Sequence, residues 1–314
     1  MFGEELYKIK AVILGHAVAD ALGVPVEFCS REELDENPVE TMEGDGTYPY
    51  PAGAWSDDTS MTLCALDVLA EGELDWTEIM LNFARWLTDG KYSSVDVCFD
   101  VGRTCKDAII NCIVNEIPAV ESGGISERSN GNGSLMRILP FILYTEFVDC
   151  DEEPMDIIHK ASAMTHAHER SKVGCGIYSF IIRRLLKSQN VESVFEGLRD
   201  AEEYYRNFTQ FSHYKRLLDP DFKNLDRSEI KSSGYVVDTL EAAVWCLLNT
   251  DSYRECVLKA VNLGEDTDTV AAVAGGLAGA LYGYDAIPSE WLETLMKREF
   301  IEDMCERAHC QWFM

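Results

Sequence analysis

The sequence is short of basic residues. Its 314 residues include 27 Lys and Arg against 55 Asp and Glu, which gives a formal net charge of −28. A surface with this charge repels phosphate backbones and anionic lipids, so we expect neither general nucleic-acid binding nor membrane binding. The same charge favours divalent cations as ligands, although most of the acidic residues must be solvated surface groups.

The sequence also lacks paired cysteines and a signal peptide. Its 11 cysteines contain no CxxC pair. Cys98, Cys105 and Cys112 recur every seven residues, which is typical of one helix face, and about 10.5 Å of helix separates successive thiols, too far to share a metal. We therefore interpret the cysteines as small buried groups in a reduced chain. The N-terminus MFGEELYKIK has no signal-peptide pattern and no apolar run reaches about 18 residues, so we expect a cytoplasmic protein.

Strand-type alternation, linkers and fixed-period repeats are nearly absent as well. Helical periodicity instead predicts an all-α protein. The predicted helices are Lys8–Leu22, Ser60–Glu71, Thr77–Leu87, Ser94–Ile113, Leu135–Phe147, Pro154–Met164, Ser171–Leu186, Val191–Phe208, Val236–Leu248, Tyr253–Leu263, Thr269–Tyr282 and Ser289–Ala308. The polar motifs lie far apart in sequence, so we expect one compact bundle over residues 1–314, folded around a central cleft, and a monomer.

Two acidic clusters each begin a predicted helix. Ser56-Asp57-Asp58-Thr59 precedes one helix, and Glu265-Asp266-Thr267-Asp268-Thr269 opens another. Helix capping alone would explain either cluster. However, capping needs only one such side chain, and adjacent carboxylates repel each other unless a cation lies between them. Carboxylates and hydroxyls without Cys or His favour magnesium or manganese over zinc, and the two clusters together could supply ligands for two ions.

Glycines give a clue to how the two clusters could meet. Gly275, Gly279 and Gly283 fall on one ridge of the last acidic helix, where each interior glycine costs up to about 1 kcal/mol relative to alanine. Close crossing with another helix would compensate that cost. A core helix built merely of small residues is the alternative, but it does not explain the acidic residues at the helix start.

Six ordered motifs resemble the ADP-ribosylglycohydrolases, a family that includes dinitrogenase-reductase-activating glycohydrolases and ADP-ribosylarginine and ADP-ribosylserine hydrolases. The resemblance covers about residues 10–300. The motifs are GHAVADALGVPVEF (15–28), GAWSDDTSM (53–61), NGNGSLMR (130–137), MTHAH (164–168), SSGYVVDTLEAA (232–243) and NLGEDTDTVAAVAGGLAGALYG (262–283).

The resemblance implies an all-α domain that holds two Mg²⁺ or Mn²⁺ ions. It implies that the metal ligands are Ser56, Asp57, Asp58, Asp266, Asp268 and Thr269. Glu27 falls at the position of an acidic residue that gates or assists the site in relatives, and otherwise would be an exposed acid. The candidates for general acid, general base or metal-assisted catalysis are Glu27, Asp57, Asp58 and Asp268. Asp20 is expected to support the ligands from behind.

The resemblance also implies an ADP-ribose site. The loop Asn130, Gly131, Asn132, Gly133 and Ser134 would bind the diphosphate with backbone N–H groups at a helix start, although such a sequence is usually a turn. His166 is a candidate phosphate contact and otherwise a cap or core residue. Ser233, Gly234 and Tyr235 are weaker candidates for ADP-ribose contacts.

The expected reaction is metal-dependent hydrolysis of the N- or O-glycosidic bond that joins ADP-ribose to a protein or a small molecule. A catalytically silent ADP-ribose-binding relative, as among lens crystallins, is one alternative. A di-metal hydrolase of another nucleoside glycoside or of a phosphoester is the other. Residues 205–232 match no motif, so the sequence does not identify the acceptor.

Overall fold

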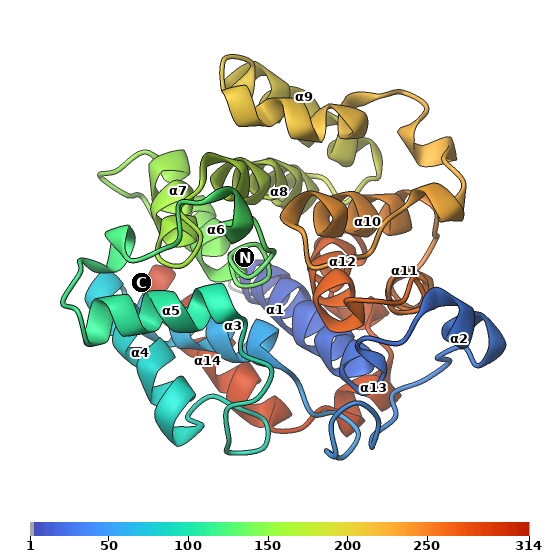
Figure 1. The fold of residues 1–314 in the computed structure, drawn as a ribbon, viewed down its shortest axis with the longest axis horizontal. Helices are drawn as coiled ribbons and strands as arrows, with labels where there is room; N and C mark the ends of the chain where they lie inside the picture. Colours follow the sequence, from blue (N-terminus) through green and yellow to red (C-terminus); the bar gives the residue numbers. More distant parts are fainter. Residues whose placement is uncertain (1–2, 314) are drawn as a thin grey trace.

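The computed structural model describes residues 3–313, and this part of the chain folds into helices joined by turns, without a β-sheet (Figure 1). The α-helices are α1 (Glu4–Gly23), α2 (Arg31–Glu36), α3 (Asp57–Leu69), α4 (Trp76–Asp89), α5 (Arg103–Ile113), α6 (Leu139–Phe147), α7 (Pro154–Ala163), α8 (Glu169–Lys187), α9 (Glu192–Tyr205), α10 (Val236–Leu248), α11 (Tyr253–Val261), α12 (Thr267–Tyr282), α13 (Ser289–Thr294) and α14 (Arg298–Trp312). The predicted all-α fold is confirmed.

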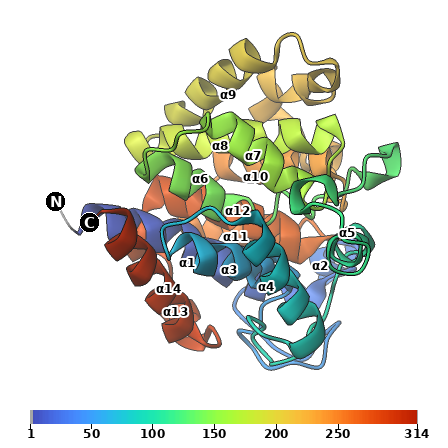
Figure 2. The same ribbon diagram turned by 90° about the vertical axis from the view of Figure 1, so that its left-hand side faces the viewer.

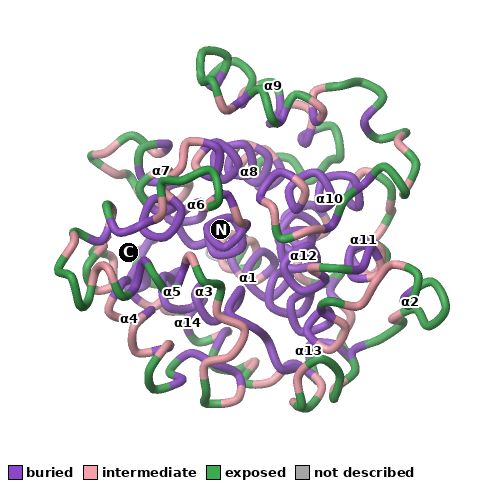
Figure 3. The backbone as a smooth tube through the Cα atoms, in the orientation of Figure 1, coloured by how far each residue is buried: buried purple, intermediate pink, exposed green. Residues whose placement is uncertain are grey.

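Helices α1 and α12 form the centre of the protein. They share the most extensive contact between any two helices, and both are buried along nearly their whole length (Figure 3). A Cβ atom on Gly275 would lie 2.3 Å from the carbonyl oxygen of Gly15, and one on Gly279 would lie 2.0 Å from that of Ala11. The two backbones therefore touch, which confirms the predicted close crossing for Gly275 and Gly279.

Two other glycines have different roles. Gly283, predicted to lie on the same ridge, ends α12 with a positive φ of 83° and takes no part in the crossing. Gly23 is the last residue of α1, and its φ of −81° is helical. A Cβ on Gly23 would lie 2.4 Å from the Cα of Asp268. The close approach at Gly23 thus brings the end of α1 against the acidic start of α12.

The predicted helix Ser94–Ile113 is wrong in its first half. The helix begins at Arg103, and the preceding residues follow an irregular path in which Tyr92, Asp96 and Asp100 have positive φ. The Ser94 hydroxyl donates to the carbonyl of Trp55 and accepts from its N–H, so tertiary contacts hold this segment out of the helix. Cys98 consequently lies outside the helix on which it was predicted.

Two other helices begin or break where the chain imposes a stop. The predicted helix Leu135–Phe147 starts only at Leu139, with Pro140 in its first turn, where the missing N–H costs nothing. The predicted helix Ser289–Ala308 is two helices. Lys297, with a φ of 47°, separates α13 from α14.

Helix α1 corrects the expectation that no segment is apolar enough to span a membrane. Glu4–Val26 has a mean hydropathy of 1.5 over its most apolar window, and 83% of that window is buried inside the protein. By length and composition it could cross a membrane, but its apolar side chains pack against other helices. This pattern is that of a core helix in a helical bundle.

Most of the region that matches no motif, residues 205–232, consists of short turns on the outside of the bundle. It contains 3₁₀ turns at Thr209–Leu218, Phe222–Asn224 and Arg227–Glu229. The first of these packs with α9 against α8, on the outer side of the protein (Figure 2). Arg31 donates to the carbonyls of Arg227 and Ile230, which ties the end of this segment to α2.

Candidate metal centre and substrate cavity

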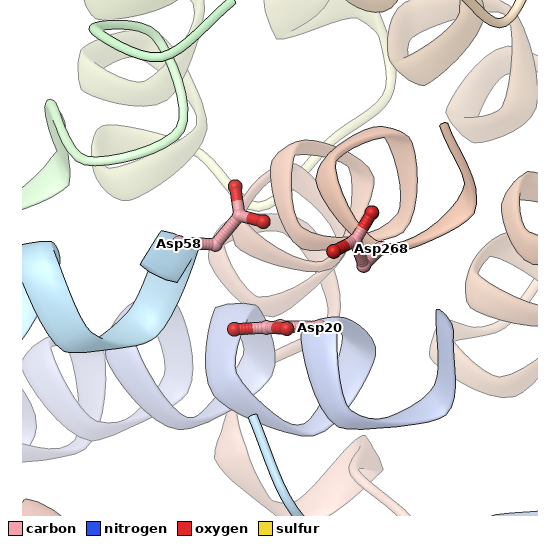
Figure 4. A group of neighbouring side chains, drawn as sticks. All are labelled: Asp20, Asp58 and Asp268. Carbon is pink, nitrogen blue, oxygen red and sulfur yellow. The ribbon is translucent and has the colours of Figure 1, made fainter. Parts of the chain in front are cut away.

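Three helices bring their acidic residues to one point. Asp58 at the start of α3 and Asp268 at the start of α12 reach into the same space, beside Asp20 of α1 (Figure 4). Carboxylate oxygens of the three residues lie within 4.8 Å of one another, and none of the three side chains is more than 1% exposed. The predicted meeting of the two acidic clusters is therefore present in the fold.

Asp20 holds the start of α3 in place. Its carboxylate accepts hydrogen bonds from the backbone N–H groups of Ser56 and Thr59, both at 3.0 Å, and from the Thr59 hydroxyl at 2.6 Å. Asp20 therefore accepts hydrogen bonds from N–H groups at the start of α3, which is the usual role of an acidic capping residue. The carboxylates of Asp57 and Asp58 are left available for another purpose.

The hydroxyls of both clusters converge on one oxygen of Asp58. The Ser56 hydroxyl lies 2.9 Å from Asp58 Oδ2, and the Thr269 hydroxyl lies 3.2 Å from the same atom. In contrast, Asp58 Oδ1 and Asp268 Oδ2 are buried and have no hydrogen-bond partner in the part of the chain that the structure describes. Buried carboxylate oxygens are costly unless they are paired or bind a metal. This set of oxygen donors therefore fits a hard divalent cation.

A further group of acids includes Asp268 and extends toward the cavity. Carboxylate oxygens of Glu27, Asp100 and Asp268 lie within 4.8 Å of one another, and Glu27 Oε2 is buried without a hydrogen-bond partner. Asp100 was not among the predicted site residues, because the seven-residue cysteine repeat indicates a helix in this segment. The only available signal was Gly102, which lies two residues later and directly precedes the true helix start.

Burial and mutual repulsion raise the pKa values of these acids. Burial raises the pKa of Asp20 to about 6, and burial together with the neighbouring charges of Asp100 and Asp266 raises that of Glu27 to about 9. The pKa values of Asp57, Asp58 and Asp268 rise well above the usual range for the same two reasons. Such a cluster carries its full negative charge only when a cation offsets it.

The loop that contains Thr47 and Tyr48 holds Glu27 and Asp100 in place by hydrogen bonds. The Tyr48 hydroxyl donates to Asp100 Oδ1 at 2.8 Å, and its ring packs against Phe99 and Tyr50. The neighbouring Thr47 hydroxyl donates to the carbonyl of Glu27 at 2.6 Å. One Gly-, Pro- and aromatic-rich loop thus ties down both of the acids that it covers.

A cavity of about 230 Å³ opens beside the acidic residues. Its lining includes nine of the predicted site residues, namely Glu27, Asp57, Asp266, Thr269, Gly131, Asn132, Gly133, His166 and Gly234. Arg103, Thr104, Cys105 and Met136 also line it and were not predicted. The acidic residues of the lining form one wall, and Gly131, Asn132 and Gly133 with His166 form the other.

The loop 130–134 is held at its central residue, Asn132, and the N–H groups of the two flanking glycines are free. The Asn132 N–H donates to the carbonyl of Gly234, and the Asn132 side chain donates to Asp266 Oδ2 at 2.9 Å, which links the loop to the acidic wall. Within residues 3–313, the N–H groups of Gly131 and Gly133 donate no hydrogen bond. Free N–H groups in a turn can bind an anion.

Three predicted substrate contacts lie behind or beside the cavity. The Ser134 hydroxyl is fully buried and accepts from Ser162, and Asn130 accepts from the Ser171 hydroxyl. Tyr235 is half-buried near the Arg170 guanidinium. The loop also does not lead directly into a helix, since α6 begins only at Leu139. Any anion binding therefore depends on the turn itself rather than on a helix start.

Comparison with known proteins gives a consistent result over the whole chain. The family model described as ADP-ribosylglycohydrolase matches residues 4–312. An ADP-ribosylarginine hydrolase, Tri1 of Serratia proteamaculans, is 34% identical over 97% of this chain and 79% of its own length. Tri1 of Pseudomonas putida is 32% identical over 96% of this chain and 78% of its own length.

Two further relatives extend the match in function and structure. The ADP-ribosyl-[dinitrogen reductase] glycohydrolase of Rhodospirillum rubrum is 33% identical over 90% of this chain and 88% of its own length. A solved structure described as an ADP-ribosylglycohydrolase-related protein complex has a TM-score of 0.83 and 27% identity, with 100% of both chains covered. The chain therefore belongs to the ADP-ribosylglycohydrolase family.

Proposed function

We propose that this enzyme hydrolyses the bond between ADP-ribose and the guanidinium group of arginine side chains in modified proteins. Hydrolysis of an ADP-ribose glycosidic bond follows from membership of the family. Arginine as the acceptor is supported by the names of two relatives, at 34% and 32% identity, which are ADP-ribosylarginine hydrolases.

The negative charge of the cavity lining favours a cationic acceptor. Glu27, Asp57, Asp100 and Asp266 line it, against one basic residue, Arg103. Glu27 and Asp100 lie outside the set of six predicted metal ligands, and the proposal assigns their carboxylates to the acceptor. A guanidinium group gains from both carboxylates, whereas a neutral serine hydroxyl gains much less.

We infer that two divalent cations, magnesium or manganese, bind between α3 and α12. Their ligands would be the six residues Ser56, Asp57, Asp58, Asp266, Asp268 and Thr269. The buried oxygens Asp58 Oδ1 and Asp268 Oδ2, which lack hydrogen-bond partners, support this assignment. When bound, such ions lower the pKa of water and stabilise charge at an oxygen.

The protein's own residues would divide the remaining tasks between the two walls. The N–H groups of Gly131 and Gly133 and the ring of His166 would bind the diphosphate and so fix the ribose against the acidic wall. Glu27 and Asp100, fastened by the loop that contains Thr47 and Tyr48, would hold or release a proton beside the bond that breaks.

The test compares acceptors under one set of conditions. The purified enzyme is incubated with a protein ADP-ribosylated on arginine and with a peptide ADP-ribosylated on serine, each with Mg²⁺, Mn²⁺ or EDTA. We expect metal-dependent release of free ADP-ribose from the arginine substrate at least about tenfold faster than from the serine substrate, because only the former is cationic.

Each alternative result has a definite meaning. Faster release from serine overturns the arginine proposal. Release in EDTA at the rate seen with Mg²⁺ overturns the metal proposal. If AMP appears in place of ADP-ribose, the enzyme hydrolyses the diphosphate bond and not the glycosidic bond. If neither product appears, the chain is a silent relative.

A further inference from the structure

Arg137 is a buried cation without an acidic partner. Its side chain is 0% exposed, and within residues 3–313 no carboxylate forms an ion pair with it. Only Nη2 has hydrogen-bond partners, namely the Ala161 carbonyl at 3.0 Å and the Thr165 hydroxyl at 2.7 Å, while Nε and Nη1 have none. The Phe83 ring, with its centroid 4.9 Å from Arg137 Cζ, also faces the guanidinium, but no acid neutralises a charge placed so deeply, and this calls for an explanation.

Arg137 controls the hydroxyl group of Thr165. Because a guanidinium can only donate, the 2.7 Å contact occupies a lone pair of Thr165 Oγ1. The same oxygen lies 2.9 Å from Nδ1 of His166. The Cys105 thiol also faces Thr165, but a thiol sulfur is a weak acceptor. The hydroxyl proton of Thr165 therefore has one good acceptor, which is a lone pair on His166 Nδ1.

This assignment fixes the proton on the other ring nitrogen. If Nδ1 accepts a hydrogen bond, the neutral ring must carry its proton on Nε2. The opposite arrangement, with Nδ1–H donating to Thr165, would leave the buried hydroxyl without a good acceptor, at the cost of an unsatisfied donor. Burial and the nearby Arg137 charge also lower the pKa of His166 to about 3, which keeps the ring neutral.

The free side of the ring faces the diphosphate loop. A Cβ atom on Gly131 would lie 3.5 Å from His166 Nε2, and His166 lines the cavity. Within residues 3–313, Nε2 forms no hydrogen bond. An Nε2–H group at this position is a donor directed toward the cavity, beside the free N–H groups of Gly131 and Gly133.

We infer that Arg137 and Thr165 are positioning residues that lock His166 in its Nε2–H tautomer, so that the neutral ring donates a hydrogen bond to an anionic oxygen of the substrate diphosphate. This inference rests on the proposed function for the identity of the substrate. This chain of hydrogen bonds from Arg137 through Thr165 to His166 accounts for the buried guanidinium. It also explains how an uncharged imidazole ring can donate a hydrogen bond to an anion.

Thr165→Val tests this chain of hydrogen bonds because valine keeps the shape of threonine and removes the hydroxyl. Thr165→Ser retains the hydroxyl and should restore the behaviour of the wild type. Thr145→Val is the matched control, since Thr145 is also a buried threonine that accepts a hydrogen bond from an arginine, Arg183 at 2.6 Å, away from the cavity.

The first readout needs no substrate. In ¹⁵N-labelled, metal-free protein, the imidazole nitrogen shifts identify the tautomer of His166. We expect Nε2–H in the wild type, Thr165→Ser and Thr145→Val, and loss of this single tautomer in Thr165→Val. An Nδ1–H ring in the wild type would overturn the inference whether or not the enzyme releases ADP-ribose.

The second readout is the split between KM and kcat on the ADP-ribosylated arginine substrate. We expect Thr165→Val to raise KM about tenfold and to change kcat less than about twofold, because a hydrogen bond to an anionic oxygen is lost in both the ground state and the transition state. Thr165→Ser should return KM to the wild-type value. An unchanged KM in Thr165→Val would overturn the contact between His166 and the diphosphate.

Discussion

The two walls of the cavity are built on opposite principles. On the acidic wall, helix starts place carboxylates at the cavity, and the more deeply buried Asp58 Oδ1 and Asp268 Oδ2 have no hydrogen-bond partner within residues 3–313. On the other wall, a turn presents N–H groups at Gly131 and Gly133 that donate no hydrogen bond within the same residues, and the ring beside them, His166, stays neutral. The first wall therefore needs cations to be stable in its charged form, whereas the second needs an anion to satisfy its donors.

This difference separates what each wall contributes to catalysis. Charges that act on the reacting bond should determine kcat, and donors that bind the diphosphate at a distance should determine KM. Asn132 joins the two walls, because its side chain donates to Asp266 while its N–H donates to Gly234. The predictions below test whether the walls are as distinct in function as they are in chemistry.

The largest effect is expected on the acidic wall. Asp57→Asn or Asp268→Asn removes a charged ligand but keeps the side-chain shape, so turnover should fall by more than about a hundredfold, beyond the effect of losing a residue that only supports a ligand. Circular dichroism should report unchanged helix content. Turnover is measured as ADP-ribose released with saturating Mg²⁺.

A matched control distinguishes a ligand from an ordinary acid at a helix start. Asp75 begins α4 and accepts from the N–H groups of Thr77 and Glu78, away from the cavity. Asp75→Asn should leave kcat unchanged within about twofold, because asparagine caps a helix as well as aspartate. Full turnover in both Asp57→Asn and Asp268→Asn would mean that no metal pair acts at this site.

A smaller effect is expected from a methyl group added to the opposite wall. A Cβ on Gly133 would lie 2.8 Å from His166 Cε1 and 2.9 Å from Cys105 Sγ, whereas one on Gly131 would make only ordinary contacts, at 3.5 Å and beyond. Gly133→Ala should displace the loop or the ring and raise KM by about tenfold. Gly131→Ala should raise KM less. A fall in kcat with no change in KM would break the proposed division between the walls.

The acidic wall was also the more predictable from sequence. Its residues lie in two short motifs at helix starts, and the ridge of Gly275 and Gly279 correctly indicated the helix crossing that brings them together. Helical periodicity gave the all-α fold for the same reason, since long apolar stripes report burial directly. Local pattern and tertiary structure agree at these positions.

The parts that could not be predicted depend on contacts between distant segments. Asp100 was not predicted as a site residue because the cysteine repeat favours a helix there. Hydrogen bonds between Ser94 and Trp55 instead hold this segment in a non-helical path. The burial of Ser134 behind its loop depends on its contact with Ser162, 28 residues away. No local pattern distinguishes such residues from their exposed neighbours.

Tyr48 offers a finer test of the acidic wall. Tyr48→Phe removes the donor to Asp100 and keeps the aromatic packing, so kcat should fall by about tenfold, less than the roughly hundredfold or more for loss of an acid or base itself, because Asp100 remains. Loss of this donor also raises the pKa of Asp100 further, which moves the acidic limb of the pH–rate profile to higher pH.

Tyr50→Phe is the natural comparison for that variant. Tyr50 packs in the same aromatic group, and its hydroxyl forms no hydrogen bond within the described part of the chain. Its kcat and pH profile should match those of the wild type. Equal losses in the two variants would assign the effect to packing of the loop and not to the bond with Asp100.

The smallest expected effect is on stability in the absence of metal. Folding raises the pKa of Asp20 to about 6 and that of Glu27 to about 9, so the folded protein holds these protons more tightly than the unfolded chain. Their stabilising contribution is complete below about pH 4 and is lost as the pH rises through the folded pKa values. The melting temperature in EDTA should therefore fall by a few degrees between pH 5 and pH 9. Saturating Mg²⁺ should abolish this fall, because bound cations favour the charged carboxylates. If the melting temperature in EDTA rises over the same range, folding does not raise the pKa values of these acids. The proposed electrostatic difference between the two walls is then wrong.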